Sequence, residues 1–438
     1  MKKLSERTAV WLKVTPQTPL LLTGKTAVSN FQQSQSHISG GTLRGAIGSK
    51  LLRQSRQAFE ALFADEEPYF GNGYYGNGSP IWPFPLTAQS CKRYPGFVDE
   101  SGEEKHGVID LLADDFAYDM VSDPMLFADL LPMSRERLQS NIGDWFMIER
   151  LDIPKGLNPE KCPDKKAKPG RCAICCKPLA PINGTYFAAI PKPFNSDKVP
   201  VARKTQVAIN RARAVAQHAL LYTQERLDVV DQGAFYAQVS LPTDKVAVLA
   251  AAIEGTFYIG RGRSKGNGRI VIQIITPPEF PSIAGRLYDL NSRLKGAFQP
   301  YAKAQPDKVS AQMPGTFFSL TLRSPAILHH AGRPLRVPTS QMLNLSQATH
   351  IHPVRAWARL DNVSGWDSAA RLPRRRELAV RAGSVYLFWA DETVDPVQLQ
   401  AELERLELNG IGAARERGFG QLTVCAPFHY ADLAGENK

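Results

Sequence analysis

The sequence predicts an α+β protein built from two similar domains. Its 438 residues are enough for two domains with cores of their own. Hydrophobic residues make up 43% of the chain and aromatic residues 9%, as in an ordinary folded protein. A helix, a basic glycine loop and a strand follow one another twice along the chain, and an internal duplication is the most informative fold signal that a single sequence can carry.

The C-terminal copy begins with a helix at Asp395-Pro396, where an N-cap residue precedes proline at the first helical position. Apolar residues then recur at helical spacing, at Leu399, Leu403 and Leu406. The loop Gly410–Gly420 follows and contains Arg415 and Arg417. The segment after it, Phe419–Val424, is expected to form a strand.

The earlier copy has the same order of elements. Its helix follows Thr243-Asp244, with apolar positions at Val246, Leu249, Ala250 and Ile253. Its loop spans residues 260–269, and the strand Ile270–Ile275 comes next.

Both loops have the composition of an anion-binding turn. Glycine permits positive φ and close approach of a ligand, successive N–H groups form a concave anion site, and arginine adds charge for phosphate. The residues that we expect to bind phosphate in the loops are Gly260, Arg261, Gly262, Arg263, Lys265, Gly266, Gly268, Arg269, Gly410, Gly412, Arg415, Arg417, Gly418 and Gly420. A tight hairpin or helix C-cap is the alternative interpretation. The P-loop and dinucleotide fingerprints are excluded, because neither loop has the required spacing or follows a strand and opens a helix.

The first helix is expected at Gly40–Arg53, with Ser39 as its N-cap. A helix N-terminus attracts phosphate, and Arg44 and Lys50 are placed to serve the same ligand. Close packing of the helix on a sheet through Gly45 and Gly48 is an equally good reason for the glycines.

These features resemble the RAMP superfamily, the ferredoxin-like RNA-binding proteins of CRISPR effector complexes. The C-terminal G-h-G-x5-G-h-G loop, where h is apolar, is that superfamily's signature, and His37–Gly48 with Arg44 and Val207–Arg211 resemble its helix entries. Two glycine loops with a cysteine-bearing insertion are similar to the two-domain subunit of type III-D effectors. The resemblance implies two ferredoxin-like β-α-β-β-α-β domains. It also implies a non-catalytic subunit that binds guide RNA, with Arg44, Arg211 and the loops as contacts.

The charge of the chain agrees with a nucleic-acid partner. Lys and Arg number 53 and Asp and Glu number 42, which gives a net charge of +11 and a pI near 9.3. No apolar run reaches the roughly 18 residues of a membrane span, and the N-terminus lacks a signal-peptide core. The cytoplasm is therefore the expected location.

A region of different composition, about 63–200, is expected to be an insertion in the first domain. Its start, Phe70–Pro85, is rich in glycine, proline and aromatic residues and is expected to be a loop. The first domain then spans 1–277, a linker with a short helical stretch spans 278–314, and the second domain spans 315–438. In that second domain, the arginine run at 374–376 fits either a phosphate-facing loop or a solvated turn.

The insertion carries a candidate zinc site. Cys172 and Cys175 form a C-x-x-C pair, which in a chain of this kind is more often metal-binding than disulfide-bonded. Zinc takes four thiolate or imidazole ligands, and Cys91 and His106 are the first choice for the other two. Cys162 and Cys176 are the reserve ligands, and free cysteines without metal are the alternative.

The sequence shows no assembled catalytic centre. Polymerase-type Gly-Gly-Asp-Asp and His-Asp motifs are absent, and Asp110, Asp114 and Asp115 form the nearest acid cluster. His37 lies where RAMP processing nucleases place a general base. Guide-RNA binding, above all of the 5′ repeat-derived handle, is the expected function. Metal-independent cleavage of precursor guide RNA is one alternative, and a backbone subunit that assists target cleavage is the other. The expected partners are guide RNA, target RNA and the other effector subunits, including the large signal-synthesising subunit and backbone RAMP subunits.

Overall fold

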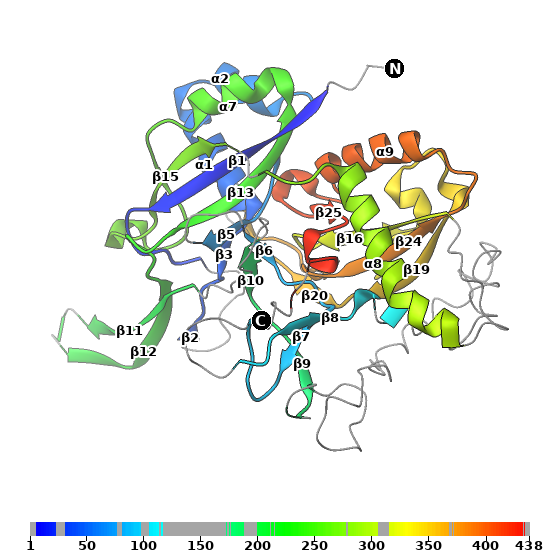
Figure 1. The fold of residues 1–438 in the computed structure, drawn as a ribbon. Coiled ribbons are helices and arrows are strands. Elements are labelled where there is room, and N and C mark those ends of the chain that lie inside the picture. Colours follow the sequence, from blue (N-terminus) through cyan, green and yellow to red (C-terminus); the bar gives the residue numbers. More distant parts are fainter. Residues whose placement is uncertain are drawn as a thin grey trace.

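The computed structural model describes most of the chain outside the middle of the expected insertion. The described residues are 6–22, 31–76, 81–97, 105–113, 115–116, 172, 175, 177–187, 199–210, 212–213, 215–276, 279–304, 315–367, 370, 372–431 and 433. They form a mixed α+β structure in which two helix-covered sheets lie side by side, with small sheets below them (Figure 1). Among the described helices, none combines the length and apolar character needed to cross a bilayer.

The first large sheet is antiparallel and built around β1 and β13. Its strand order is β14 (Thr256–Tyr258), β15 (Arg269–Ile275), β1 (Arg7–Pro16), β13 (Ala234–Pro242), β5 (Gly73–Gly76) and β3 (His37–Ile38), and β4 (Tyr69–Phe70) also pairs with β13. The helices α1 (Gly40–Gln54), α2 (Arg56–Phe63) and α7 (Val246–Ala252) contribute apolar residues to the same core as these strands. Four of these strands follow one another in the chain as β1, β5, β13 and β15, and they lie along the sheet in the order β15, β1, β13 and β5.

Helix α1 forms where its cap and its apolar spacing predict it. The Ser39 side chain accepts a hydrogen bond from the Thr42 N–H group, which caps the first turn as expected. Leu43, Ile47 and Leu51 are buried, and because they are four residues apart they share the face that packs on the sheet.

The second large sheet has the order β19 (Ile351–Trp357), β24 (Val385–Ala390), β16 (Thr316–Leu322) and β25 (Leu422–Val424). It is antiparallel and repeats the strand order of the first sheet. Its core includes the buried faces of α9 (Pro396–Asn409) and α8 (Ile283–Ala304), and α8 lies before the first strand of this sheet in the chain. Every residue of β24 is buried, in keeping with its position inside the sheet.

The smaller sheets carry the rest of the described strands. Beneath the large sheets lie β8 (Val108–Asp110), β7 (Ala88–Cys91) and β9 (Leu179–Pro181) (Figure 1). The pair β10 (Thr185–Phe187) and β6 (Ile81–Pro83) lies next to β5. The hairpin β11 (Val201–Asn210) and β12 (Val215–Leu227) projects from the body and pairs with β2 (Phe31–Gln32). Short pairs are β17 (His329–His330) with β18 (Arg333–Pro334), β20 (Leu360–Val363) with β23 (Glu377–Val380), and β21 (Trp366–Asp367) with β22 (Leu372–Pro373).

Three local expectations differ from the structure. The segment Phe70–Pro85 was expected to be a loop, but residues 69–70 and 73–76 form β4 and β5 of the first sheet and residues 81–83 form β6, because β4 and β5 find hydrogen-bonding partners along β13. The short helical stretch before Pro314 is the long helix α8, since Leu290, Leu294 and Phe298 bury one face in the second core. The last strand is shorter than 419–424, because the glycine loop continues up to Gln421.

Candidate nucleic-acid interface and metal cluster

The two glycine loops share one backbone hydrogen-bond pattern. Each loop donates two N–H groups to a segment that follows the first strand of its own sheet. The four N–H to carbonyl pairs are Arg261–Leu21, Gly268–Pro19, Ala413–Ile327 and Gly420–Pro325, at 2.9, 2.9, 2.9 and 2.8 Å. The two loops that the sequence showed as similar therefore also share their backbone hydrogen bonds.

This pattern aligns the loops residue by residue. The matched positions are Gly260 with Gly412, Gly262 with Ala414, Arg263 with Arg415, Lys265 with Arg417, Gly266 with Gly418, and Gly268 with Gly420. Each loop contains one 3-10 turn, flanked on both sides by a residue in the left-handed region. In the second loop the first of these residues is Ala414, whose φ of 59° is unfavourable for a residue with a Cβ atom.

Many of the N–H groups that were expected to bind phosphate are occupied within the protein. In the first loop, Lys265 and Asn267 both donate to the carbonyl of Gly262. In the second, the Arg417 N–H group donates to Ala414 and the Gly418 N–H group to Arg415. The cationic side chains on the loops, and not these backbone groups, are thus the part of each loop that remains available to an anion.

The first loop presents its cations to solvent. The side chains of Arg261, Arg263, Lys265 and Arg269 are all exposed, and the residue between Arg263 and Lys265 is the neutral Ser264. A Cβ atom added to Gly266 would meet nothing within 4 Å, so the tip of this loop is open.

The second loop is half-buried, because it packs against the start of α1. A Cβ atom on Gly418 would lie 2.6 Å from the carbonyl oxygen of Phe70 and 3.0 Å from the Cα atom of Gly40. The Gly40 N–H group donates to the Asn72 side chain at 3.0 Å. Protein atoms therefore occupy the N-terminus of α1, where the sequence suggested a phosphate.

A pocket of about 560 Å³ opens beside this contact, and we call it the junction pocket. Its lining residues come from α1, from the α2–β4 turn, from β4, from the segment after β22 and from the second loop. They are Arg44, Glu67, Tyr69, Arg374, Glu416 and Arg417. The fold thus brings Arg44 and Arg417, both expected from the sequence, to one cavity, and it adds Arg374 from the arginine run.

Arginine stacking fixes the aromatic wall of the junction pocket. The guanidinium carbon of Arg7 lies 4.0 Å from the centre of the Tyr69 ring, and that of Arg415 lies 5.1 Å from it. Cation–π contacts of this length are favourable and orient the guanidinium planes. The sequence does not single out Arg7, Glu67 or Tyr69, because each lies in an ordinary strand or turn and only the fold brings them together.

Acidic side chains accompany each arginine of the junction pocket. The Nη2 atom of Arg44 lies 2.9 Å from both carboxylate oxygens of Glu67. Arg417 lies 3.4 Å from Glu416 and 4.0 Å from Glu377, and Arg374 lies 3.2 Å from Asp367. The pocket therefore offers both hydrogen-bond donors with positive charge and acceptors with negative charge.

Lys50, another expected RNA contact, has its partners within the protein. The Lys50 ammonium group donates to the carbonyls of Ala252 and Glu254 at the end of α7 and lies over the Phe257 ring. The structure thus does not bring Lys50 and Arg44 to one ligand. Arg211 lies outside the described residues.

The cysteine and histidine residues expected to bind zinc do converge. One ligand atom from each of Cys91, His106, Cys172 and Cys175 lies within 4.8 Å of all the others. The Sγ atoms of Cys91 and Cys175 are 3.6 Å apart, and His106 Nδ1 is 3.2 Å from Cys172 Sγ. Tetrahedral zinc with bonds of about 2.3 Å places its sulfur ligands roughly 3.8 Å apart, so this cluster can hold a metal ion. The reserve ligands Cys162 and Cys176 lie outside the described residues.

The environment of Cys91 favours a thiolate. Burial alone would raise the pKa of the thiol. The backbone N–H groups of Tyr94 and Arg93 and the neighbouring Cys175 and Cys172 outweigh burial and lower the pKa. Thiolates are the form in which cysteine binds metals.

His37 lies in β3 beside Tyr74, with ring centres 5.7 Å apart. Burial lowers the pKa of this half-buried imidazole to about 4. A base of that strength is poorly matched to proton abstraction near neutral pH.

Comparisons with known proteins agree with the expected class. Residues 287–426 match the family described as "CRISPR-associated protein (Cas_Cmr3)". This match confirms the resemblance to subunits of type III CRISPR effector complexes. No curated protein sequence matches the chain.

Three solved structures of CRISPR proteins or complexes contain chains with low similarity to this one. A chain of the Type III-B Cmr-beta complex bound to cognate target RNA is 11% identical, with 86% of each chain covered and a TM-score of 0.37. A chain of the Csm3-Csm4 subcomplex of the type III-A interference complex is 11% identical, covering 87% of this chain and 94% of that chain, with a TM-score of 0.30. A Cas6 product complex is 14% identical, covering 44% of this chain and 77% of that chain, with a TM-score of 0.28.

Proposed function

We propose that this chain is a non-catalytic subunit of a type III CRISPR ribonucleoprotein that binds guide RNA through its 5′ repeat-derived handle. The observation that carries the proposal is the convergence of Arg44 and Arg417 in the junction pocket, with Arg7 and Arg415 stacked on its Tyr69 wall. Arginine forks match phosphate geometry and stack on planar groups, which is the chemistry of RNA backbone capture. The family match of residues 287–426 supports the same class.

The two glycine loops divide the proposed contact between them. The first loop offers exposed cations at Arg261, Arg263, Lys265 and Arg269, which suits several phosphates in a row along one strand. The second loop holds its arginines half-buried at the junction pocket, which suits one fixed nucleotide. In this proposal the first loop contributes most of the positive charge that attracts the RNA, and the junction pocket fixes the position of one nucleotide.

The proposed architecture is two ferredoxin-like domains, at 1–277 and 315–438, joined through 278–314. The matching antiparallel strand orders of the two large sheets and the matching loops support it. The insertion, at about 63–200, is proposed to bind one structural zinc ion through Cys91, His106, Cys172 and Cys175. Three thiolates and one imidazole in a closed arrangement are typical of structural rather than catalytic zinc.

The proposed partners follow from this role. They are guide RNA, target RNA, the large signal-synthesising subunit and backbone RAMP subunits, in a cytoplasmic complex that acts in antiviral defence. The rival nuclease function would use His37, the candidate base at the entry of the first helix, and the low pKa of that imidazole does not favour it.

The direct test is incubation of the purified full chain with repeat-derived guide RNA, with and without a metal chelator. Stable retention of intact RNA is the expected result. Discrete cleavage fragments that disappear in His37→Ala would refute the non-catalytic role. A protein that binds no guide RNA at low salt would refute the RNA-binding role itself.

A further inference from the structure

The α2–β4 turn beside the junction pocket is held in a strained shape. Asp65 and Glu66 both have a φ of 43°, a region that residues with a Cβ atom seldom occupy. Strain of this kind persists only where surrounding groups enforce it, and it gathers at functional sites. Glu67, a lining residue of the junction pocket, is the next residue in the chain.

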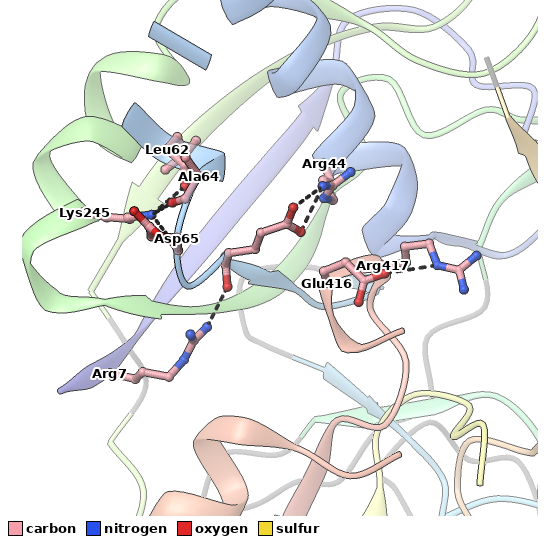
Figure 2. Close-up of polar contacts among 9 residues, drawn as sticks. Arg7, Arg44, Leu62, Ala64, Asp65, Lys245, Glu416 and Arg417 are labelled. Carbon is pink, nitrogen blue, oxygen red and sulfur yellow. Dashed lines mark hydrogen bonds and ion pairs between the residues drawn. The ribbon is translucent and has the colours of Figure 1, made fainter. Parts of the chain in front are cut away.

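Two cations enforce this turn from outside the pocket. The Lys245 ammonium group donates to the carbonyls of Leu62, Ala64 and Asp65 at 3.2, 2.5 and 2.5 Å. Figure 2 shows Lys245 reaching the turn from one side, with Arg7 and Arg44 at its other end. Arg7 donates to the backbone carbonyl of Glu67 at 3.1 Å, so the backbone of Glu67 is held as well.

The side chain of Glu67 is fixed yet accessible. A single nitrogen of Arg44 contacts both carboxylate oxygens, at 2.9 Å each, and the guanidinium carbon of Arg44 lies 5.1 Å from the Phe63 ring centre. The Glu67 side chain nevertheless remains 36% exposed. A carboxylate has about four lone-pair sites, so the two contacts with Arg44 leave acceptor capacity toward the pocket.

A carboxylate repels a bound phosphate, so in a pocket for phosphate alone Glu67 could serve only to hold Arg44. A nucleotide also carries hydroxyl donors on its ribose, and a carboxylate accepts from the ribose 2′-hydroxyl in dinucleotide-binding folds. The junction pocket combines three arginines with a fixed carboxylate in about 560 Å³, within the range of small-ligand pockets.

We propose that Glu67 accepts a hydrogen bond from the 2′-hydroxyl of one nucleotide in the junction pocket and so distinguishes RNA from DNA. Arg374 and Arg417 hold the adjoining phosphate, and Lys245 and Arg7 are positioning residues that keep the turn in shape. The 2′-hydroxyl is the group by which a protein separates the two nucleic acids at a given site. This inference rests on the proposed RNA-binding function.

The test compares oligouridylate with its 2′-deoxy counterpart of the same length, by fluorescence anisotropy with the full chain at fixed salt. The wild type binds the ribose form more tightly. In Glu67→Gln the acceptor loses its charge, so the ratio of the two affinities falls by roughly fivefold, while affinity for both strands rises because a negative charge is gone. Glu67→Asp keeps the charge but shortens the reach, and its ratio falls as well.

The matched control is Glu416→Gln, which removes the same charge from the same pocket. It raises affinity for both strands and leaves the ratio at the wild-type value. A ratio unchanged in both Glu67 variants would overturn the proposal, since Glu67 would then serve only to hold Arg44. Wild-type protein that binds both strands equally would overturn it too and leave RNA binding standing. Failure of the wild type to bind either strand would overturn this inference, and failure to bind guide RNA as well would overturn the proposed function with it.

Discussion

Removing the two cations at the tip of the first glycine loop should weaken RNA binding in a salt-dependent manner. The change is Arg263→Ala with Lys265→Ala, two exposed residues on one 3-10 turn. Each phosphate contact on a single strand contributes about 0.7 to the slope of log affinity against log salt concentration, so the loss of two contacts flattens the slope by about 1.4. Between about 50 and about 200 mM salt, the affinity difference between wild type and variant should therefore shrink roughly sevenfold.

The assay is a salt titration of guide-RNA binding by fluorescence anisotropy, with thermal denaturation of each protein beside it. The control is Arg293→Ala with Lys295→Ala, an exposed Arg and Lys at the same spacing on α8. The control should keep the wild-type slope, and both variants should keep the wild-type melting temperature. Equal slopes for all three proteins would refute the placement of RNA on the first loop, whereas equal flattening in both variants would show only nonspecific charge.

Three further predictions concern the metal cluster, the second loop and His37. Elemental analysis should find about one zinc ion per chain, and Cys172→Ser with Cys175→Ser should remove it; a fully folded wild type without metal would contradict the site. Gly418 and Gly266 share a backbone conformation, with φ of 92° and 79°, but only a methyl group added at 418 meets a carbonyl. Gly418→Ala should therefore be less stable than Gly266→Ala by roughly 1–3 kcal/mol and should melt at a lower temperature. Equal melting temperatures of the two variants would contradict the close contact. The pKa of His37 is depressed to about 4 in the folded protein, so the unfolded chain takes up a proton first as the pH falls, and the free energy of unfolding should decrease between about pH 6.5 and pH 4. In urea titrations, His37→Phe should make this decrease smaller. A pH profile that is the same in wild type and variant would show that the imidazole is solvated.

The sequence predicted the features that depend on local chemistry. The cap at Ser39, the proline start of α9 and the apolar spacing of α1 and α9 are written in neighbouring residues, and the structure has these helices where they were expected. The similarity of the loops was visible because glycine reaches the left-handed region at three matched positions, Gly260 and Gly412, Gly266 and Gly418, and Gly268 and Gly420. The four residues of the Cys and His cluster could be named from the sequence, because few types of side chain bind zinc and the C-x-x-C pair is formed by neighbouring residues.

Tertiary structure alone decided which of these residues meet, because a contact between distant segments depends on how the two sheets pack. Arg44 and Lys50 both belong to α1, yet Arg44 lines the junction pocket with Arg417, whereas Lys50 contacts the end of α7. Tertiary structure also turned the glycine-rich segment at Tyr74 into a sheet strand, since pairing with β13 supplies hydrogen bonds that no local rule could foresee. Glu67 shows the same limit most clearly. Nothing in its neighbours distinguishes it from other surface glutamates, and only the strained turn and the facing Arg44 make it part of a pocket.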